Sequence, residues 1–281
     1  MTYSIVAADP AAHEVGVATQ SKFLAVGAVV PWARGDVGAV ATQSFADATF
    51  GPRGLDLLAT GLEPKSVLDR LLGPDEGREH RQVGIVDASG QAASFTGSAC
   101  FEHASSLTGA GFACQGNILA SANVVPAMAE TFERATGQPL ADRLVVALRA
   151  AQREGGDRRG QESAGLLIAK PGAGYGGNND RYLDLRVDHH DDPIEELAGL
   201  LALHRLYFER PRKEDLIAPD AALEEEIRIM LQAMGRLREG QDVWAALEEY
   251  MGWENLEERW AGRGHLDPRV LEYLRGQAES G

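Results

Sequence analysis

The residue best suited to chemistry is Thr2, which follows Met1 and opens the run TYSIVAAD. An initiator methionine in front of a small residue such as threonine is usually removed, which would leave Thr2 with a free α-amine. With a reference pKa of about 7.7–8.0, that amine can act as general base for the hydroxyl of its own residue near neutral pH. A threonine activated in this way can hydrolyse an amide, whereas a Thr2 that merely follows the start codon would be inert.

Other polar residues near expected strand ends could lie close to Thr2 and take part in the same chemistry. Asn117, in the run QGN, could donate a hydrogen bond to an oxyanion, or could serve only the turn after its strand. Gln43 and Ser44 end another strand and could line the same opening. Ser4 lies on the same strand face as Thr2 and is the alternative nucleophile, although it has no free amine.

The strands and helices that position these residues come in groups. Short β-branched runs separated by Asp, Pro and Gly predict strands at 2–9, 15–21, 25–30, 37–44, 111–117, 163–170 and 181–187, and a hairpin at 82–97. Apolar periodicity predicts helices at 52–60, 64–73, 124–135, 139–153 and 192–208. Hairpins with grouped helices indicate an α+β fold. Because the strands are apolar on both faces, we expect two sheets between helical layers.

A smaller helical module is expected after a linker at 209–216, which gives two domains, 1–208 and 217–281. Its helices are predicted at 220–234, 242–251 and 267–277. It holds three of the four tryptophans, Trp244, Trp253 and Trp260. In so small a module tryptophans are expected to form the core, although they could also stack on sugar rings.

Charge and composition narrow the classes of partner. The formal net charge is −15, and residues 191–281 alone carry 21 acidic against 11 basic residues. This balance argues against a nucleic-acid partner. No apolar run has the length of a membrane span and no secretory signal is recognised, so we expect no membrane partner. Two cysteines, Cys100 and Cys114, fit a reducing compartment, and the expected location is the cytoplasm.

Six segments spread over residues 2–208 carry a family resemblance. They are TYSIVAAD (2–9), AVGAVVPWARGDVGAVATQ (25–43), FGPRGL (50–55), QGNIL (115–119), GGDRRGQESAGLLI (155–168) and GYGGNNDRYLDLRVD (174–188). These segments resemble a bacterial family, the domain of unknown function 1028 (DUF1028), within the N-terminal-nucleophile hydrolase superfamily. The resemblance implies a four-layer αββα sandwich with the nucleophile at the tip of the first strand. It implies no particular substrate.

The C-terminal module resembles a second family. Its segments ALEEYMGWENLEERW (246–260) and HLDPRVLEYLR (265–275) are similar to a helical domain described as peptidoglycan-binding. This resemblance implies a glycan partner, and a protein partner is the alternative.

The superfamily resemblance also implies three residues that hold the terminal amine and tune its pKa. Lys22, directly after the second strand, fits the role of a cation that lowers the pKa of the amine, or is a solvated charge at a strand end. Asp157 and Ser163, in GGDRRGQES, fit the other roles: Asp157 would orient the amine or a basic neighbour, and Ser163 would hydrogen-bond it. Asp157 could instead pair with Arg158 or Arg159 to fix its loop.

Two further motifs are expected to be structural. Residues 188–192 have metal-ligand types, but neighbouring strand residues point in opposite directions, so a helix-capping loop is expected and no metal. The Gly-rich run 172–177 lies between two strands without a helix N-terminus after it. It is therefore expected to be a hairpin loop beside the site, not a phosphate cradle. No cofactor is predicted.

Two functions from different classes fit these observations. The first is a hydrolase of carbon–nitrogen bonds that cleaves a small-molecule amide, lactam or acyl-amino substrate through an acyl-enzyme on Thr2. The second is a non-catalytic binding or assembly module with the same fold, in which the acidic C-terminal helices dock a partner. A homo-oligomer is expected in either case because members of the superfamily often assemble.

Overall fold

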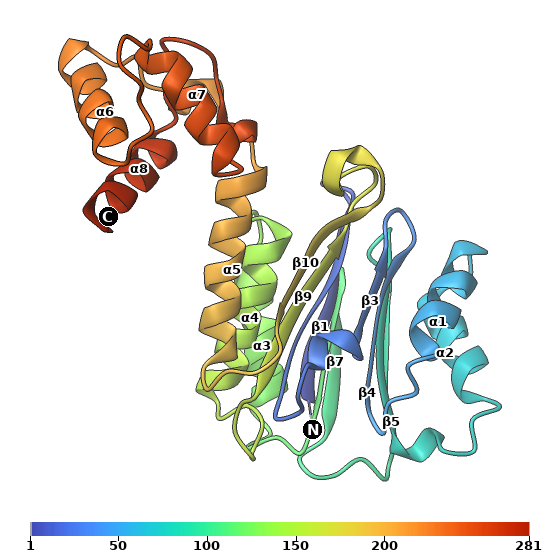
Figure 1. The fold of residues 1–281 in the computed structure, drawn as a ribbon. Helices are drawn as coiled ribbons and strands as arrows, with labels where there is room; N and C mark the ends of the chain where they lie inside the picture. The colour runs from blue at the N-terminus through green and yellow to red at the C-terminus, as the bar shows by residue number, and fades with distance from the viewer. Residues whose placement is uncertain (1, 281) are drawn as a thin grey trace. The chain divides into compact units, whose positions relative to one another are not determined.

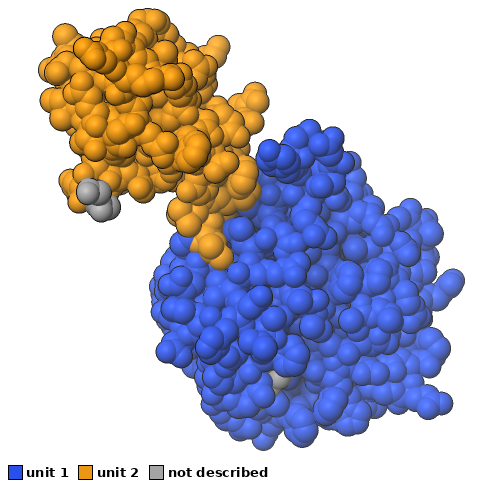
Figure 2. All heavy atoms as spheres, viewed as in Figure 1, with its two compact units in different colours: residues 1–199 blue, residues 200–281 orange. Residues whose placement is uncertain are grey.

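A computed structural model describes residues 2–280, which belong to two compact units, residues 1–199 and 200–281 (Figure 2). The division falls inside helix α5, Pro193–Phe208. Among the described residues, no helix is both long and apolar enough to cross a membrane.

The first unit is a mixed α/β fold built on two antiparallel sheets (Figure 1). Six strands form one sheet in the order β10-β9-β2-β1-β8-β7, and four form the other in the order β3-β4-β5-β6. The bounds of the larger sheet are β1 Thr2–Asp9, β2 Glu14–Ser21, β7 Ser105–Gly109, β8 Phe112–Asn117, β9 Ser163–Ala169 and β10 Arg181–Val187. Those of the smaller sheet are β3 Pro31–Arg34, β4 Gly38–Ser44, β5 Arg81–Asp87 and β6 Ala92–Thr96.

Helices pack on the outer face of each sheet. Helices α1 (Phe50–Ala59) and α2 (Pro64–Leu72) lie on the four-stranded sheet, with a core that includes Leu71 and Ile85. Helices α3 (Val124–Arg134) and α4 (Leu140–Arg153) lie on the six-stranded sheet, as Figure 1 shows. The inner faces of the two sheets pack against each other through small and β-branched side chains. These are Val6, Ala8, Val15, Val17, Ala39, Ala41, Val86 and Ala113.

Most predicted elements are confirmed to within three residues, but the strand predicted at 25–30 is wrong. Residues Val26–Ala28 form a 3-10 turn that starts after Ala25 in the left-handed region (φ 53°), and strand β3 begins only at Pro31. An apolar run predicts burial, and a buried turn satisfies it as well as a strand does. The turn lies so close to β9 that a Cβ added to Gly165 would be 2.9 Å from the Cα of Gly27.

Strand β7 is an element that the sequence analysis missed. Its residues, SSLTG, contain no run of β-branched or aromatic side chains, and it lies half-exposed at the edge of the six-stranded sheet. Its pairing with β8 therefore comes from the sheet and not from local preference.

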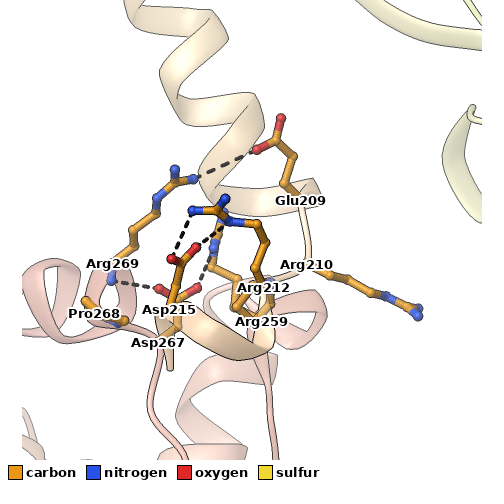
Figure 3. Close-up of a pocket in the computed structure, with 9 residues that line it drawn as sticks. Glu209, Arg210, Arg212, Asp215, Arg259, Asp267, Pro268 and Arg269 are labelled. Atoms are coloured by element: carbon orange, nitrogen blue, oxygen red, sulfur yellow. Dashed lines mark hydrogen bonds and ion pairs between the residues drawn. The ribbon is translucent and has the colours of Figure 1, made fainter. Parts of the chain in front are cut away.

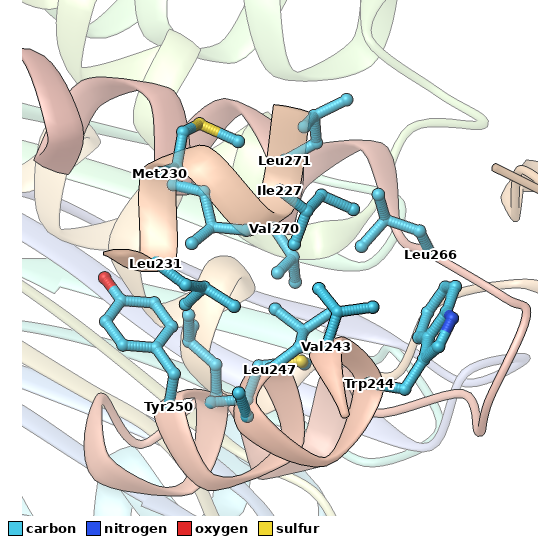
Figure 4. Packing of buried hydrophobic residues seen from close by; sticks show 14 residues of the cluster. Ile227, Met230, Leu231, Val243, Trp244, Leu247, Tyr250, Leu266, Val270 and Leu271 are labelled. Atoms are coloured by element: carbon cyan, nitrogen blue, oxygen red, sulfur yellow. The ribbon is translucent and has the colours of Figure 1, made fainter. Parts of the chain in front are cut away.

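The second unit is helical and has its own core (Figure 4). It contains helices α6 Ala221–Ala233, α7 Val243–Trp253 and α8 Pro268–Ser280. Trp244 is 5% exposed and its ring lies 6.4 Å from that of Trp260, so both belong to the core. Trp253 is different, because it is 68% exposed.

We predict that Leu247→Ala destabilises this second unit by about 2–5 kcal/mol, because Leu247 is 1% exposed in its core and truncation leaves a cavity. The measurement is urea unfolding followed by tryptophan fluorescence, which reports mainly on this unit. The matched control is Ile229→Ala, since Ile229 is 57% exposed on α6. Equal destabilisation by the two variants would contradict this account of the core.

Candidate functional site

Thr2 is the first described residue of β1 and lies at the end of the space between the two sheets. It is 5% exposed, and its Oγ1 donates a hydrogen bond to Ser21 Oγ at 3.1 Å. On the other side of β1, its Cα is paired with that of Asn117 in β8. Met1 lies outside the described residues, so its removal stays a prediction.

The interior between the sheets changes from apolar to polar along the strands. Side chains at alternate positions share a strand face, so the row that begins with Val6 and Ala8 continues into Ser4 and Thr2. The facing strands change in the same direction. The result is a cluster of buried polar side chains at the end where Thr2 lies: Thr2, Ser4, Gln43, Gln82, Gln115 and Asn117.

Gln82 is the hub of this polar cluster. Its Oε1 accepts hydrogen bonds from Gln43 Nε2 (2.8 Å) and Asn117 Nδ2 (2.9 Å). Its Nε2 donates to Thr96 Oγ1 at 2.9 Å and to the Gly116 carbonyl at 2.8 Å. Gln82, on β5, therefore bonds to β4 and β6 of its own sheet and to β8 of the facing sheet.

Gln43 carries the network to Thr2. Its Nε2 donates to the Thr2 carbonyl at 3.1 Å, and its Oε1 accepts from Ser4 Oγ at 2.6 Å. Ser4 Oγ in turn accepts from Gln115 Nε2 at 2.6 Å. The backbone of Thr2 is thus held by a chain of amides, while its hydroxyl points to Ser21.

The predicted residues Asp157 and Ser163 meet at one place, the loop that follows β2. Asp157 has a fully buried side chain that accepts from the backbone N–H of Lys22 at 3.0 Å. Ser163 Oγ donates to the Phe23 carbonyl at 2.5 Å and accepts from the Val26 N–H at 3.0 Å. Both residues therefore fix residues 22–26, which begin directly after the Thr2 partner Ser21.

The charged side chains near this loop are paired with one another. Lys22 Nζ donates to Glu162 Oε2 at 2.8 Å and to the Gln161 carbonyl at 2.9 Å. Its ammonium is therefore bound to the residues that directly precede β9. Hydrogen bonds from Lys22 and then His189 lower the pKa of Glu162. Asp157 also pairs with Arg159 at 3.3 Å, as the structural alternative for this residue predicted.

The two motifs expected to be structural lie at opposite ends of the six-stranded sheet. Residues 188–192 follow β10, whose last residues pair with the start of β9 at the Thr2 end. In residues 188–192, His189 contacts Glu162 and His190 accepts from the Asp192 N–H, so the two rings turn to different partners. The Gly-rich run 172–177 does join β9 to β10, but its predicted position beside the site is wrong. Strand β9 begins at the Thr2 end of the sheet, so the loop that follows it lies at the opposite end.

Sequence reasoning missed Ser21, Gln82 and Gln115. The available signal was a polar side chain at the end of an otherwise apolar strand, a signal that was used for Asn117 and Gln43. Gly84 carries a further one, because a Cβ there would lie 2.2 Å from Gln115 Oε1. The glycine makes room for a buried amide on the facing sheet.

The loop after β4 is anchored by an ion pair. Arg81 Nη1 donates to the Phe45 carbonyl, and its Nε donates to Asp75 Oδ2 at 2.8 Å. The Arg81 guanidinium holds the pKa of the Asp75 carboxyl below its ordinary value of 3.8. Asp75 thus orients the arginine that holds Phe45.

The second unit has a pocket of its own (Figure 3). It is lined by Glu209, Arg210, Pro211, Arg212, Asp215, Arg259, Asp267, Pro268 and Arg269. The buried Arg259 pairs with Asp267 and also donates to the carbonyls of Arg205 and Leu206 at the end of α5. Arg212 pairs with Asp215 at 2.7 Å. Arg259 and Arg212 therefore bind groups of the second unit itself, and we assign them a structural role in this pocket.

Comparison with known proteins follows the division into two units. Residues 2–197 match the model of a family of unknown function, DUF1028, and the chain belongs to that family. The family predicted from the sequence is thereby confirmed. Residues 207–274 match a second model, described as "Putative peptidoglycan binding domain".

A solved structure supports the same assignment. The crystal structure of a protein from Silicibacter pomeroyi, also described by the DUF1028 model, is 32% identical to this chain with a TM-score of 0.65. The match covers 73% of this chain and 89% of that one. No curated protein matches the chain.

We predict that Gln82→Met destabilises the first unit by roughly 2–5 kcal/mol, because it leaves the buried amide donors of Gln43 and Asn117 without their acceptor. The measurement is urea unfolding followed by far-ultraviolet circular dichroism. The control is Gln91→Met, at an exposed position between β5 and β6. A loss no larger than that of the control would show that the hub contributes little.

A second prediction concerns pH. Asp75→Asn should lower stability by about 1 kcal/mol at pH 6, where the wild-type carboxylate is ionised and bonded to Arg81. Since the folded pKa lies below 3.8, the wild-type advantage should shrink as the pH falls below 3.8 and through the folded value. Unfolding at pH 6 and pH 3 measures this. Asp69→Asn, with a side chain 73% exposed, is the control, and an advantage at pH 3 as large as at pH 6 would contradict the ion-pair account.

Proposed function

We propose that this protein is an N-terminal-nucleophile amidohydrolase that cleaves a small amide, lactam or acyl-amino substrate through an acyl-enzyme on Thr2 after removal of Met1. The observation that carries the proposal is the position of Thr2. Its hydroxyl bonds to Ser21 Oγ at the tip of an inner strand, and its carbonyl is held by Gln43. In this proposal the two facing sheets with helices on their outer faces are the four-layer αββα sandwich of that superfamily.

The proposed reaction uses the Thr2 α-amine as base. The amine takes the hydroxyl proton as Oγ1 attacks the substrate carbonyl, and the resulting ammonium protonates the leaving amine when the carbon–nitrogen bond breaks. Water then cleaves the ester by the same route. Asn117 Nδ2 uses one N–H on Gln82, and its second N–H is the proposed donor to the oxyanion.

The remaining predicted residues are assigned positioning roles. Asp157 and Ser163 hold the backbone of residues 22–26, and so set the place of Ser21 beside the Thr2 hydroxyl. Lys22 is assigned to the same loop through its pair with Glu162. In this form of the proposal the amine is tuned by its buried surroundings and not by direct contact with the Lys22 ammonium.

A binding or assembly module with the same fold is the second candidate for the first unit. The observation that favours it is the low exposure of Thr2, 5%, together with the engagement of Lys22 at Glu162. Under this alternative Met1 stays attached or Thr2 is unreactive.

For residues 207–274 we propose a glycan partner, as the name of the matching family suggests. Trp253 supports this assignment because its exposed ring is backed by the Arg236 guanidinium, 4.7 Å from the ring centroid. An exposed, braced indole is a suitable platform for a sugar ring. The cytoplasm and a homo-oligomer remain the proposed compartment and assembly.

We predict that Thr2→Ala abolishes both amide turnover and acylation by a β-lactone probe, while stability falls by only about 1 kcal/mol, the net value of one hydrogen bond. Intact-mass and peptide mapping measure the adduct and show whether Met1 is absent. Ser4→Ala, which removes a buried hydroxyl from the same strand face, should still be acylated. Undiminished turnover in Thr2→Ala would refute Thr2 as the nucleophile. A wild-type chain that keeps Met1, or whose processed Thr2 never reacts, would favour the binding module instead.

A further inference from the structure

We propose that the acyl part of the substrate is apolar, an alkyl chain or an aromatic ring, and that it packs on three exposed phenylalanines around Thr2. These side chains are Phe23, Phe45 and Phe101, and we call them the aromatic rim. The proposal rests on the proposed function, because acylation of Thr2 is the event that brings the acyl group to this place.

The three phenylalanines lie in segments that are connected to the neighbours of Thr2. Thr2 has three neighbours on different strands, Ser21 on β2, Gln43 on β4 and Asn117 on β8. Two residues after Ser21 comes Phe23, and two residues after Gln43 comes Phe45. The residue after Asn117, Ile118, donates its N–H to the Phe101 carbonyl at 3.0 Å. Each segment beside Thr2 therefore leads to, or is bonded to, an exposed phenylalanine.

The exposed large apolar side chains of the first unit lie mostly in the segments beside Thr2. Its three side chains are 54–57% exposed, whereas Phe50 and Phe112 in the same unit are each 1% exposed. Within the described part of the first unit six large apolar side chains are classed as exposed, and four lie at this end: the rim and Leu24. Grouped exposed apolar side chains mark a binding surface more often than isolated ones do.

The backbone under the rim is held in place. The Phe23 N–H donates to Ser21 Oγ at 3.0 Å, the same oxygen that accepts from the Thr2 hydroxyl. The Phe45 N–H donates to the His80 carbonyl at 3.2 Å, and the two rings lie edge-to-face with centroids 5.4 Å apart. The Phe45 and Phe101 rings are 6.4 Å apart. A surface fixed in this way loses little freedom when an apolar group binds.

The charges that hold these segments are already compensated. Lys22 pairs with Glu162 beside Phe23, and Arg81 pairs with Asp75 beneath Phe45. These two pairs neutralise the Lys22 ammonium and the Arg81 guanidinium beside the rim. In an acyl-enzyme the acyl group stays bonded to Thr2 Oγ1, so its substituent must lie among the residues that flank Thr2. A neutral, apolar substituent fits these surroundings.

The test compares two sets of β-lactones that share one reactive ring and differ in its substituent. The apolar set carries benzyl or hexyl, and the polar set carries hydroxymethyl or carboxyethyl. In each case Thr2 Oγ1 attacks the carbonyl, the ring carbon–oxygen bond breaks, and the hydroxyl proton passes to the released alkoxide. The rate of adduct formation on Thr2 is followed by mass spectrometry. We expect the apolar probes to react about tenfold faster or more. Equal rates for the two sets would overturn the proposal.

The rim itself is tested with the double variant Phe45→Ser/Phe101→Ser, which should lose this preference because the apolar probes slow to about the rate of the hydroxymethyl probe. Phe45→Leu/Phe101→Leu keeps apolar surface and should retain most of the preference. The matched control is Tyr175→Ser, since Tyr175 is 82% exposed in the loop at the opposite end of the sheet. Because the substituted side chains are exposed, the variants should fold, and melting curves check this. A preference that survives in the serine variant would overturn the role of the rim.

A binding measurement separates this proposal from the proposed function. Nile red, a neutral apolar dye, should gain fluorescence with the wild type and with Tyr175→Ser, and less with the serine rim variant. If no probe acylates Thr2 but the dye depends on the rim, the nucleophile is refuted while the apolar site stands. If the dye binds all three proteins alike, the apolar site is refuted whatever Thr2 does.

Discussion

The first unit depends on one constraint: amide groups taken out of water between two sheets must find one another. Gln82 satisfies that constraint by serving Gln43, Asn117 and the Gly116 carbonyl at once. Because an unpaired buried amide is costly, these hydrogen bonds favour the observed stacking of the two sheets at this end. The same network fixes the Thr2 carbonyl through Gln43. Stability and the geometry around Thr2 therefore have a common origin, and the polar end of the interior is not a defect in the core.

Much of the fold could be predicted from the sequence because its elements are locally consistent. Strands β1 and β10 have the predicted bounds, and the predicted helices start within two residues of the observed ones. The wrong or missed elements were those that depend on tertiary contacts. Whether residues 25–30 form a strand or a turn depends on how closely Gly27 approaches Gly165, more than a hundred residues later. Strand β7 is stabilised by its antiparallel pairing with β8 and not by its own sequence.

The candidate site was predictable only in part, for a related reason. Thr2 and Asn117 were predicted from their places at strand ends, and Asp157 and Ser163 from the superfamily resemblance. Asp157 and Ser163 do converge, but on the backbone of residues 22–26, and no spacing in the sequence specifies that target. Gln82 could not be identified as a hub, because its partners lie on strands that are far apart along the chain. The positions of the glutamines were visible, but their mutual contacts were not.

The buried pair of Arg259 and Asp267 has a consequence for where the C-terminal module begins. The match to the second family starts at residue 207, and the sequence analysis placed the boundary at 217. The Arg259 guanidinium, however, also requires the carbonyls of Arg205 and Leu206. A fragment cut at either boundary would keep the arginine and lose both carbonyl acceptors. The folding unit therefore extends upstream into the last turn of α5, and a self-sufficient C-terminal fragment has to include Arg205.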